Sequence, residues 1–366
     1  MIFHVNSKEL TAGVLSVVKA LPVRTTLACL EGIFFTAQKD GLHLKCSDLM
    51  LQKDCIIPSF VEEEGSAIVP GKIIAEFVRK LPEGDVTFSI TGKEINIICG
   101  RVNTVLQPME YEDFPEMRFD GDHFSVKVSK DECRDMISQT TFATAQDDSK
   151  PILTGALIEI NDNTITAVAT DAYQFAMRKI QIESTGKEAS YVIPNKALTE
   201  ISHMMSESQE KEVTLVFTRT HVRVDIGHTI LTARLLDGAY IDYKRILPKD
   251  HKLRVILDRN AFMDSIDRAQ LVAREGGNNI ILHFTNNLVR ISASSYIGVF
   301  DENVDAVCNG DDIDIAFNPK YVMNVLKNVD DEKICIDLLS GVSPCVIKPV
   351  QGERYYYLIV PVRIYA

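Results

Sequence analysis

The segment Ile68–Cys99, IVPGKIIAEFVRKLPEGDVTFSITGKEINIIC, decides the fold because matching segments occur twice more in the 366-residue chain. The second copy is Val192–Ile226, VIPNKALTEISHMMSESQEKEVTLVFTRTHVRVDI, and the third is Ile315–Pro349, IAFNPKYVMNVLKNVDDEKICIDLLSGVSPCVIKP. Each copy combines an apolar strand, a Pro, a helical segment and two further strands. A lysine that follows the Pro and opens the helix recurs 124 residues apart each time, as Lys72, Lys196 and Lys320.

A second set of helical segments precedes these copies. It comprises Val5–Leu21 (VNSKELTAGVLSVVKAL), Val128–Ala143 (VSKDECRDMISQTTFA) and Leu257–Ala273 (LDRNAFMDSIDRAQLVA). In the first, apolar residues from Leu10 to Leu21 recur at helical spacing. The expected N-cap residues of the three helices are Ser7, Ser129 and Asp258.

A strand pair follows each of these helices. The pairs lie in Gly32–Gln52, Gly155–Ala176 and Asn279–Phe300, where β-branched and aromatic residues flank short polar turns. These turns, which predict hairpins, are Lys39-Asp40-Gly41, Asn161-Asp162-Asn163 and Asn286-Asn287.

The repeat predicts an α+β fold of three tandem domains. Each third has the order β-α-β-β-β twice, with its helices laid on antiparallel sheet. Short polar or Pro-containing links near Glu116–His123 and Leu247–Lys252 separate the thirds. The expected domains are residues 1–118, 124–248 and 251–366.

Composition limits the class of protein. The chain is 46% hydrophobic and 25% charged, which excludes collagen-like and disordered proteins. No apolar run reaches the ~18 residues that span a bilayer, and no secretory signal is visible, so we expect a cytoplasmic protein without membrane contact. Its eight Cys include no CxxC pair, which favours reduced, buried thiols over zinc. The net charge of −12 means that nucleic acid could bind only where basic residues gather on one surface.

Three similar domains in a row would leave an open sheet edge in the first and in the last. Unpaired edges are avoided in natural proteins unless they are covered or paired. Head-to-tail pairing between two chains would close a ring with a central hole. The sequence therefore suggests a ring-shaped homodimer.

Five motifs in order resemble the bacterial sliding clamp, the beta subunit of DNA polymerase III. They are KPILTGALIEI (Lys150–Ile160), ATDAYQFA (Ala169–Ala176), LLDGAYIDYKRILPKD (Leu235–Asp250), FNPKYV (Phe317–Val322) and LIVPVR (Leu358–Arg363). The resemblance covers essentially the whole chain. It implies a six-domain ring of two chains that encircles double-stranded DNA without reading its sequence. Such a processivity factor tethers the catalytic subunit of the replicative polymerase, the clamp loader and other proteins with clamp-binding peptides, and it uses no cofactor and no catalytic chemistry.

The resemblance also assigns a hydrophobic pocket for partner peptides. Apolar walls supply affinity in such a site and a few polar groups fix the peptide's register. The residues carried over are Leu153, Thr170, Ala172, Tyr173, Gln174, Phe175, Ile241, Arg245, Ile246, Asn318, Tyr321, Leu358, Val360, Pro361, Val362 and Arg363. Without the resemblance, Leu153, Ile246, Leu358 and Val360 would be interpreted as strand core.

The chain departs from the family pattern within this pocket. The family usually has a basic residue at Gln174, often Pro at Ile241, and frequently Met around Val360 and Val362. Because Val is stiffer than Met, these differences bear on which peptide motifs bind.

Two further sets of residues follow from the resemblance. The residues implied at DNA are Arg24, Lys72, Gln146, Lys150 and Lys196. The residues implied at the dimer seam are Arg101, Asn103, Thr104 and Leu106 in the first domain, and Leu271, Asp301 and Glu302 in the third. Solvated surface positions are the alternative for the lysines.

Two other functions compete with a clamp. An enzyme is disfavoured because the sequence has no GxGxxG after a strand, no GxxxxGK[ST], no GxSxG and no HExxH. The pairs Asp147-Asp148 and Asp311-Asp312 could serve a metal-dependent nuclease, but both suit solvated turns, and we expect no metal site. A diverged ring-shaped scaffold that binds only proteins, without DNA loading, is the second alternative.

Overall fold

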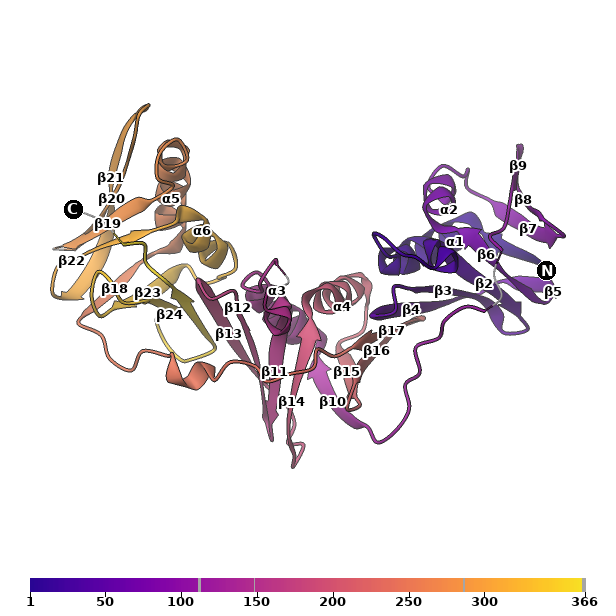
Figure 1. The fold of residues 1–366 in the computed structure, drawn as a ribbon, viewed down its shortest axis with the longest axis horizontal. Helices are drawn as coiled ribbons and strands as arrows, with labels where there is room; N and C mark the ends of the chain where they lie inside the picture. Colours follow the sequence, from indigo (N-terminus) through magenta and orange to yellow (C-terminus); the bar gives the residue numbers. More distant parts are fainter. Residues whose placement is uncertain (111–112, 148, 286, 364–366) are drawn as a thin grey trace. The chain divides into compact units, whose positions relative to one another are not determined.

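The computed structural model describes residues 1–110, 113–147, 149–285 and 287–363. Each third contains the predicted order β-α-β-β-β twice (Figure 1). The first third adds one short strand, β5, that the sequence pattern did not predict. Its elements are β1 Ile2–Asn6, α1 Ser7–Val17, η1 Val18–Ala20, η2 Ala28–Glu31, β2 Gly32–Gln38, β3 Gly41–Ser47, β4 Leu51–Ile57, β5 Phe60–Glu63, β6 Gly65–Pro70, α2 Gly71–Val78, β7 Asp85–Thr91, β8 Glu94–Cys99 and β9 Val102–Leu106.

The second and third thirds keep the same order. The second contains β10 Phe124–Ser129, α3 Lys130–Thr141, η3 Pro151–Thr154, β11 Gly155–Asn161, β12 Thr164–Thr170, β13 Gln174–Gln181, β14 Glu188–Pro194, α4 Asn195–Glu207, β15 Glu212–Phe217, β16 His221–Ile226, β17 Thr229–Arg234 and η4 Tyr243–Arg245. The third contains β18 Leu253–Asp258, α5 Arg259–Ala273, β19 Ile280–Thr285, β20 Leu288–Ser295, β21 Gly298–Gly310, β22 Ile313–Phe317, α6 Pro319–Lys327, β23 Lys333–Leu338, β24 Cys345–Pro349 and β25 Tyr355–Ile359.

The helix starts agree in part with the expected N-caps. Asp258 caps α5, since its side chain accepts a hydrogen bond from Ala261 N at 2.8 Å. The expectation for Ser7 is wrong, because Asn6 caps α1 by accepting from Lys8 N at 3.0 Å. Ser7 lies in the helix, where its hydroxyl accepts from Gly84 N. Both Asn and Ser are favourable caps, so adjacent candidates are hard to separate by residue type. The cap at Ser129 stays a prediction.

The hairpin turns lie where the sequence places them. Gln38 ends β2 and Gly41 begins β3, while Asn161 ends β11 and Thr164 begins β12. The third expected turn includes Asn286, which lies outside the described residues.

The thirds do not coincide with the compact units of the fold. Unit 1 consists of Met1–Asp131 with Glu200–Leu235, and unit 2 of Glu132–Thr199 with Leu236–Ala366. The middle third is therefore divided between the two units. The domain boundaries expected from the repeat stay a prediction.

Unit 1 contains two sheets. One has the order β5-β1-β7-β8-β9, and the other has the order β10-β15-β16-β17-β4-β3-β2-β6. The second sheet joins two thirds of the chain because β17, the last strand of the second third, pairs antiparallel with β4, placing Leu231 opposite Lys53. Helices α1 and α2 lie side by side in this unit (Figure 1).

Unit 2 contains one sheet of the order β14-β11-β12-β13-β25-β24-β23-β18-β21-β20-β19-β22. Here β25, the last strand of the third third, pairs with β13, placing Leu358 opposite Phe175. Helices α5 and α6 pack together in this unit (Figure 1). The equivalent strands thus join successive thirds in both units.

The core confirms the helical stripe predicted in the first third. Leu10, Val14 and Val17 of α1 are fully buried. Gly13 lets α1 approach β4 closely, since a Cβ at this position would lie 2.3 Å from Ile57 Cδ1.

Most of the cysteines are buried, as the sequence predicts. All eight Cys are free thiols, and all except Cys29 and Cys308 are buried. Across the described residues, none of the helices has both the length and the apolar character needed to span a bilayer.

Candidate functional site

A tight turn between β12 and β13, Thr170–Gln174, begins the candidate site in unit 2. The carboxylate of Asp171 accepts hydrogen bonds from the backbone N–H groups of Tyr173 and Gln174, both at 2.8 Å. Ala172 has a φ of +78°, which a turn of this shape requires although non-glycine residues rarely adopt it. The turn directs Tyr173 outward, with 59% of its surface exposed.

Gln174, in contrast, is buried beneath the turn. Its amide donates to the Asp171 carboxylate at 3.0 Å and to the backbone oxygen of Phe142 at 3.3 Å. Its side-chain oxygen accepts from Asn324 of α6 at 3.2 Å. Gln174 therefore links the turn to a helix 150 residues further along the chain.

The C-terminal segment runs alongside the turn. After β25, Val360 N donates to Tyr173 O at 2.9 Å, and Val362 N donates to Ala316 O at 2.8 Å. The segment is thus held on one side by the second third and on the other by the third. Val360 remains 40% exposed next to Tyr173.

Helix α6 supplies a second aromatic side chain. Asn318 caps the helix by accepting from Lys320 N at 3.0 Å, which fixes where the helix begins. Tyr321, in the first turn, stacks on Tyr173 with ring centroids 5.9 Å apart and planes 8° apart. Burial, and then the negative charge of Asp171, raises the pKa of Tyr321, so its hydroxyl stays protonated at neutral pH.

An apolar cluster lies beneath these groups. Phe175 and Tyr243 pack with centroids 5.8 Å apart, and the Tyr243 hydroxyl donates to Glu159 at 2.5 Å. Burial and this carboxylate raise the pKa of Tyr243. The buried members of the cluster are Leu157, Val168, Phe175, Met177, Val192, Tyr243, Val346 and Leu358.

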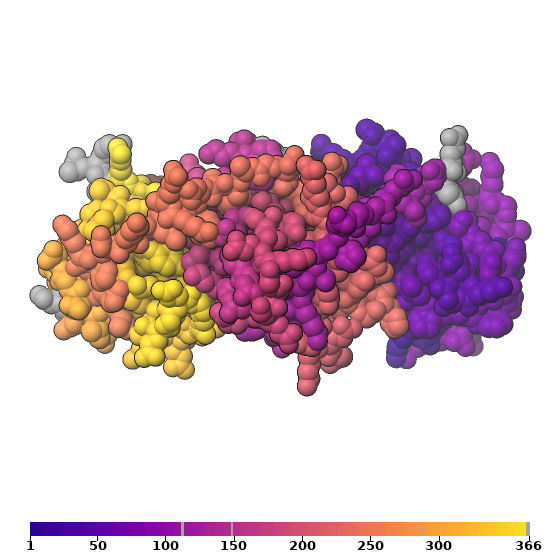
Figure 2. Space-filling view, turned by 90° about the horizontal axis from the view of Figure 1, so that it is seen from below, coloured from indigo at the N-terminus to yellow at the C-terminus, as the bar shows by residue number. Residues whose placement is uncertain are grey.

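The segment after β17 contributes two more exposed apolar side chains. Figure 2 shows this part of the chain crossing the surface of unit 2. Ile241 and Ile246 are 38% and 48% exposed, and Arg245 pairs with Asp242 at 2.7 Å. We call the exposed set Tyr173, Ile241, Ile246 and Val360 the apolar rim.

All sixteen residues expected at the peptide pocket lie in unit 2. The structure separates them into a buried part and an exposed part. Leu153, Thr170, Gln174, Phe175 and Leu358 are buried and belong to the support beneath the rim. Ala172, Arg245, Val360 and Arg363 are exposed, while Asn318, Tyr321, Pro361 and Val362 are half-buried.

Sequence reasoning missed several supporting residues. Asp171 lies inside the quoted motif ATDAYQFA, and its place before an exposed tyrosine is typical of an Asx turn. Asn324 follows Tyr321 by three positions and so shares its helix face. Tyr243 carries no comparable signal, because its contacts with Phe175 and Glu159 join segments far apart in sequence.

The residues expected at DNA are all exposed. Arg24 and Lys72 lie in unit 1, and Gln146, Lys150 and Lys196 lie in unit 2. Lys72 and Lys196 are the second residues of α2 and α4, the equivalent positions that the repeat predicts.

The residues expected at the dimer seam lie on β9 and β21, or close to them. Asn103, Thr104 and Leu106 are on β9, the edge strand of its sheet, and Arg101 precedes it. Asp301 and Glu302 are neighbours on β21 and point to opposite faces, where Arg290 and Arg268 pair with them. Leu271 of α5 is 61% exposed. Sequence reasoning missed Val105 and Val299, which are 53% and 75% exposed on the same two strands.

The carboxylates considered for metal binding, Asp147, Asp311 and Asp312, are exposed. In the described part of the chain, no group of three His, Cys, Asp or Glu could hold a metal ion. Asp147 accepts hydrogen bonds from the hydroxyl and N–H of Ser149, which lower its pKa in a solvated turn. Asp148 lies outside the described residues.

Comparisons with known proteins agree with this architecture. Three models of the DNA polymerase III beta subunit match in order: the N-terminal domain at residues 1–118, the central domain at 127–242 and the C-terminal domain at 244–363. The chain belongs to this family, the beta sliding clamps. Its members are processivity subunits without catalytic activity of their own, which accounts for the absence of enzyme motifs.

Individual relatives cover the whole fold. The beta sliding clamp of Staphylococcus epidermidis is 34% identical over 363 residues, 95% of each chain. The crystal structure of the Bacillus subtilis sliding clamp is 30% identical, covers 100% of both chains and has a TM-score of 0.95. A Pseudomonas aeruginosa clamp structure bound to griselimycin is 25% identical, with the same coverage and a TM-score of 0.92.

Proposed function

We propose that two copies of this chain pair head to tail into a ring that encircles duplex DNA and holds replication proteins on it. The observation that carries the proposal is the pairing between successive thirds. The last strand of the second third, β17, pairs with β4, and the last strand of the third third, β25, pairs with β13. The equivalent strands still without such a partner are β9, which ends the first third, and β21, which corresponds to β4 and β13.

Within the described residues of one chain, β9 and the first part of β21 each have an edge without a paired strand. Among the described residues, β9 pairs only with β8. Residues 298–305 of β21 pair with β20 on one side, whereas β18 begins to pair only at Ala306. The repeat therefore supports pairing between β9 of one chain and β21 of a second, with Val105 and Val299 on the joined strands.

Sedimentation of the full-length protein tests the ring. We expect a species of twice the 40.9 kDa chain mass at micromolar concentration. Val105→Glu should produce monomers, because it places a charge at an apolar edge that is exposed in the single chain. Ile73→Glu, at an exposed position of α2, should leave the dimer unchanged. A monomeric parent protein would contradict the proposal.

The ring would hold DNA without strong attraction, because closure prevents the duplex from leaving. Arg24, Lys72, Lys150 and Lys196, with Gln146 beside them, would contact phosphates and not base edges. Retention on nicked circular DNA after loading, followed by release when the circle is cut, distinguishes this function from a protein-only scaffold. Retention that persists on the linear product would indicate ordinary DNA binding.

The apolar rim in unit 2 is the proposed docking site for short peptides of the polymerase catalytic subunit, the clamp loader and other partners. Tyr173 at the turn, Val360 beside it, and Ile241 and Ile246 on the segment that packs on the apolar cluster provide exposed apolar area. Polar groups of the turn can fix a peptide's register. We further propose that griselimycin binds this rim and that the protein works in the cytoplasm. Calorimetric titration with griselimycin should give one site per chain, and a Tyr173→Ala variant that binds as tightly as the parent would contradict the assignment.

A further inference from the structure

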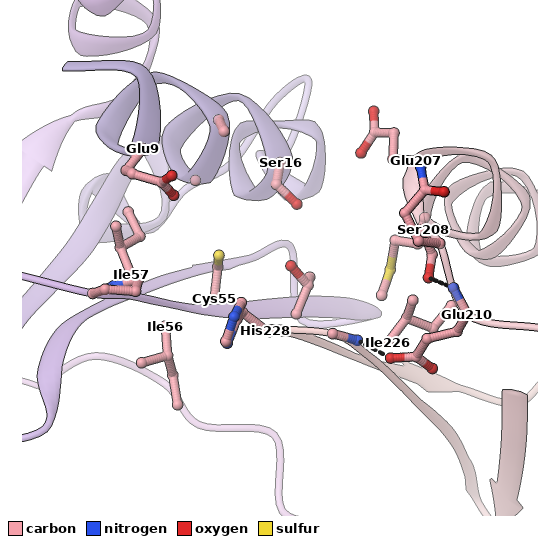
Figure 3. Close-up of a pocket in the computed structure, with 17 residues that line it drawn as sticks. Glu9, Ser16, Cys55, Ile56, Ile57, Glu207, Ser208, Glu210, Ile226 and His228 are labelled. Carbon is pink, nitrogen blue, oxygen red and sulfur yellow. Dashed lines mark hydrogen bonds between the residues drawn. The ribbon is translucent and has the colours of Figure 1, made fainter. Parts of the chain in front are cut away.

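A cavity lies entirely in unit 1 and shares no residue with the apolar rim of unit 2 (Figure 3). Its volume is about 700 Å³, which is within the range of small-molecule sites. One wall is a single face of α1, formed by Glu9, Ala12, Gly13 and Ser16. The other wall is the end of α4 and the turn that follows it, Glu207, Ser208, Gln209 and Glu210.

The floor of this cavity is apolar. Ile57 of β4, Met204 of α4 and Ile226 of β16 line it and are 2%, 4% and 5% exposed. Cys55, on β4, points its thiol into the space between α1 and α4 (Figure 3). Burial raises the pKa of this thiol, so it is uncharged at neutral pH.

Three carboxylates lie around the apolar floor. Glu9 stands on the α1 wall, and Glu207 and Glu210 stand on the opposite wall (Figure 3). No Lys or Arg is among the residues that line the cavity. Two lysines lie near these groups: Lys19, whose ammonium is 3.7 Å from Glu207 in a solvent-exposed pair, and the buried Lys53, which pairs with Glu200 at 3.3 Å. Solvent-exposed pairs contribute little, so the first of these leaves the Glu207 carboxylate available to a ligand.

Hydrogen bonds fix the position of Glu210 in the wall after α4. Ser208 Oγ accepts from Glu210 N at 3.0 Å, and the Glu210 carboxylate accepts from Gly227 N at 3.1 Å. Within the described part of unit 1, Glu9 has no ionic partner. The cavity makes the site, and the carboxylates determine the charge of what it accepts.

We propose that this cavity binds a small organic cation with an apolar body, such as an aryl amidine. The body would fill the space over Ile57 and Met204, and the cationic end would lie between Glu9 and Glu207. Planar amidinium groups suit this arrangement because they donate two hydrogen bonds to a carboxylate. The proposal is independent of the ring, since every lining residue belongs to unit 1.

Binding would also stabilise the fold. The α1 wall comes from the first third and the α4 wall from the second, so a ligand would contact both at once. A ligand that binds only the folded state raises the unfolding temperature. The site could therefore influence how firmly the first two thirds hold together.

Titration of the full-length protein with three probes of the same shape tests the proposal. The probes are 4-amidinobiphenyl, the neutral biphenyl-4-carboxamide and the anionic biphenyl-4-carboxylate. We expect saturable binding of the amidine at one per chain and a rise in melting temperature. The carboxamide should bind about tenfold more weakly or worse, and the carboxylate should not bind. Equal affinity for the amidine and the carboxamide, or no saturable binding of the amidine at millimolar concentration, would overturn the proposal.

Variants locate the binding. Glu9→Gln with Glu207→Gln should weaken amidine binding about tenfold while preserving the fold, because both residues are surface carboxylates. Glu64→Gln, an exposed carboxylate of unit 1 outside the cavity, is the matched control and should leave binding unchanged. Ala12→Trp, at an exposed position of α1, should block the cavity. Unchanged binding in both the Gln pair and the Trp variant would place the amidine elsewhere and contradict the site.

Discussion

Two turns in the molecule have the same backbone conformation but pack against different side chains. In unit 1 the turn Ser47–Leu51 joins β3 to β4, and in unit 2 the turn Thr170–Gln174 joins β12 to β13. Asp48 accepts from Met50 N and Leu51 N at 2.9 and 2.7 Å, which repeats the hydrogen bonds of Asp171. Leu49 and Ala172 have φ values of +71° and +78°. The repeat has therefore preserved the shape of the turn.

The neighbouring strand also contacts both turns in the same way. Arg234 N, at the end of β17, donates to Met50 O at 2.8 Å, as Val360 N, just after β25, donates to Tyr173 O at 2.9 Å. Met50 is 43% exposed, so unit 1 presents an apolar side chain where unit 2 presents Tyr173. Geometry alone would give the chain two similar docking turns.

The residues beneath the turns differ. In unit 2 the paired positions of β12 and β13 hold Val168, Phe175 and Met177. The equivalent positions in unit 1 hold Lys45, Gln52 and Asp54. The polar set is covered by the segment after β9, since Glu116 pairs with Lys45 at 2.5 Å and Met117 N donates to Gln52 at 3.0 Å.

The same segment is anchored by an aromatic contact. Phe114 stacks on Phe34 with centroids 5.2 Å apart, and Met109 N bonds to Ile68 O at 2.9 Å. In unit 1 the residues beneath the turn are polar and bond to this segment, whereas in unit 2 they are apolar and buried against Tyr243. Tyr173 and Val360 stay exposed beside the unit 2 turn. A repeated backbone sets where a site can form, and the side chains determine which copy becomes one.

The largest expected effect concerns the opposite face of β4. Lys53 is 1% exposed and lies 3.3 Å from Glu200, whereas the equivalent residue of β13 is Ala176. Lys53→Ala should lower the free energy of unfolding by about 3–5 kcal/mol, because it leaves a buried carboxylate unpaired. Urea denaturation measures this loss. Lys53→Met combined with Glu200→Met should recover most of it, and a single-variant loss below about 1 kcal/mol would show that the pair is not buried in solution.

Ligand affinity should distinguish the two turns. Tyr173→Ala should weaken griselimycin binding by about 1–3 kcal/mol, because it removes an exposed aromatic side chain of the apolar rim. Met50→Ala, the matched change in unit 1, should leave the affinity unchanged. Calorimetric titration of both variants measures the difference, and equal losses would mean that the two turns act alike.

A smaller effect concerns backbone strain in the turns. Ala172→Gly and Leu49→Gly should each stabilise the protein by about 0.5–1 kcal/mol, since glycine adopts positive φ without a steric penalty. Thermal denaturation measures both. Destabilisation by only one of the two substitutions would mean that the turns are not equivalent.

Much of the fold could be predicted from sequence because the evidence is local. The Pro that precedes Lys72, Lys196 and Lys320 marks three of the helices with their flanking strands. The other three helices are indicated by the helical segments that begin each third. The short strand β5 was missed because its residues are mostly exposed and show no alternation. The division into units depends on which strand edges pair, and no local pattern encodes that choice.

The resemblance predicted which residues belong to the candidate site, but not which of them are buried and which are exposed. Leu153 and Phe175 are 3% and 2% exposed, so alanine at either position would remove core contacts as well as any ligand contact. The three hydrogen bonds of the Gln174 side chain suit a buried amide better than the basic residue that the resemblance would place there. Two of these bonds, to Phe142 and Asn324, join segments far apart in the chain, which the sequence cannot reveal.

The smallest expected effect is a dependence on pH in unit 1. Burial raises the pKa of Asp54, although the hydrogen bond from Gln52 and the charge of Lys45 oppose the change. The folded state therefore holds a proton that the unfolded state releases near pH 4, so stability should fall as pH rises from there through the folded pKa. Asp54→Asn should flatten this slope in urea denaturation series, and an unchanged slope would contradict the burial of the carboxylate. Met177, at the equivalent position of unit 2, does not titrate.

Hydrogen–deuterium exchange of the full-length protein with and without griselimycin tests the central comparison most directly. If the apolar rim is the docking site, exchange should slow in residues 169–175 and 358–363 and remain unchanged in residues 46–52. Equal protection of both turns, or protection of the unit 1 turn alone, would contradict the account.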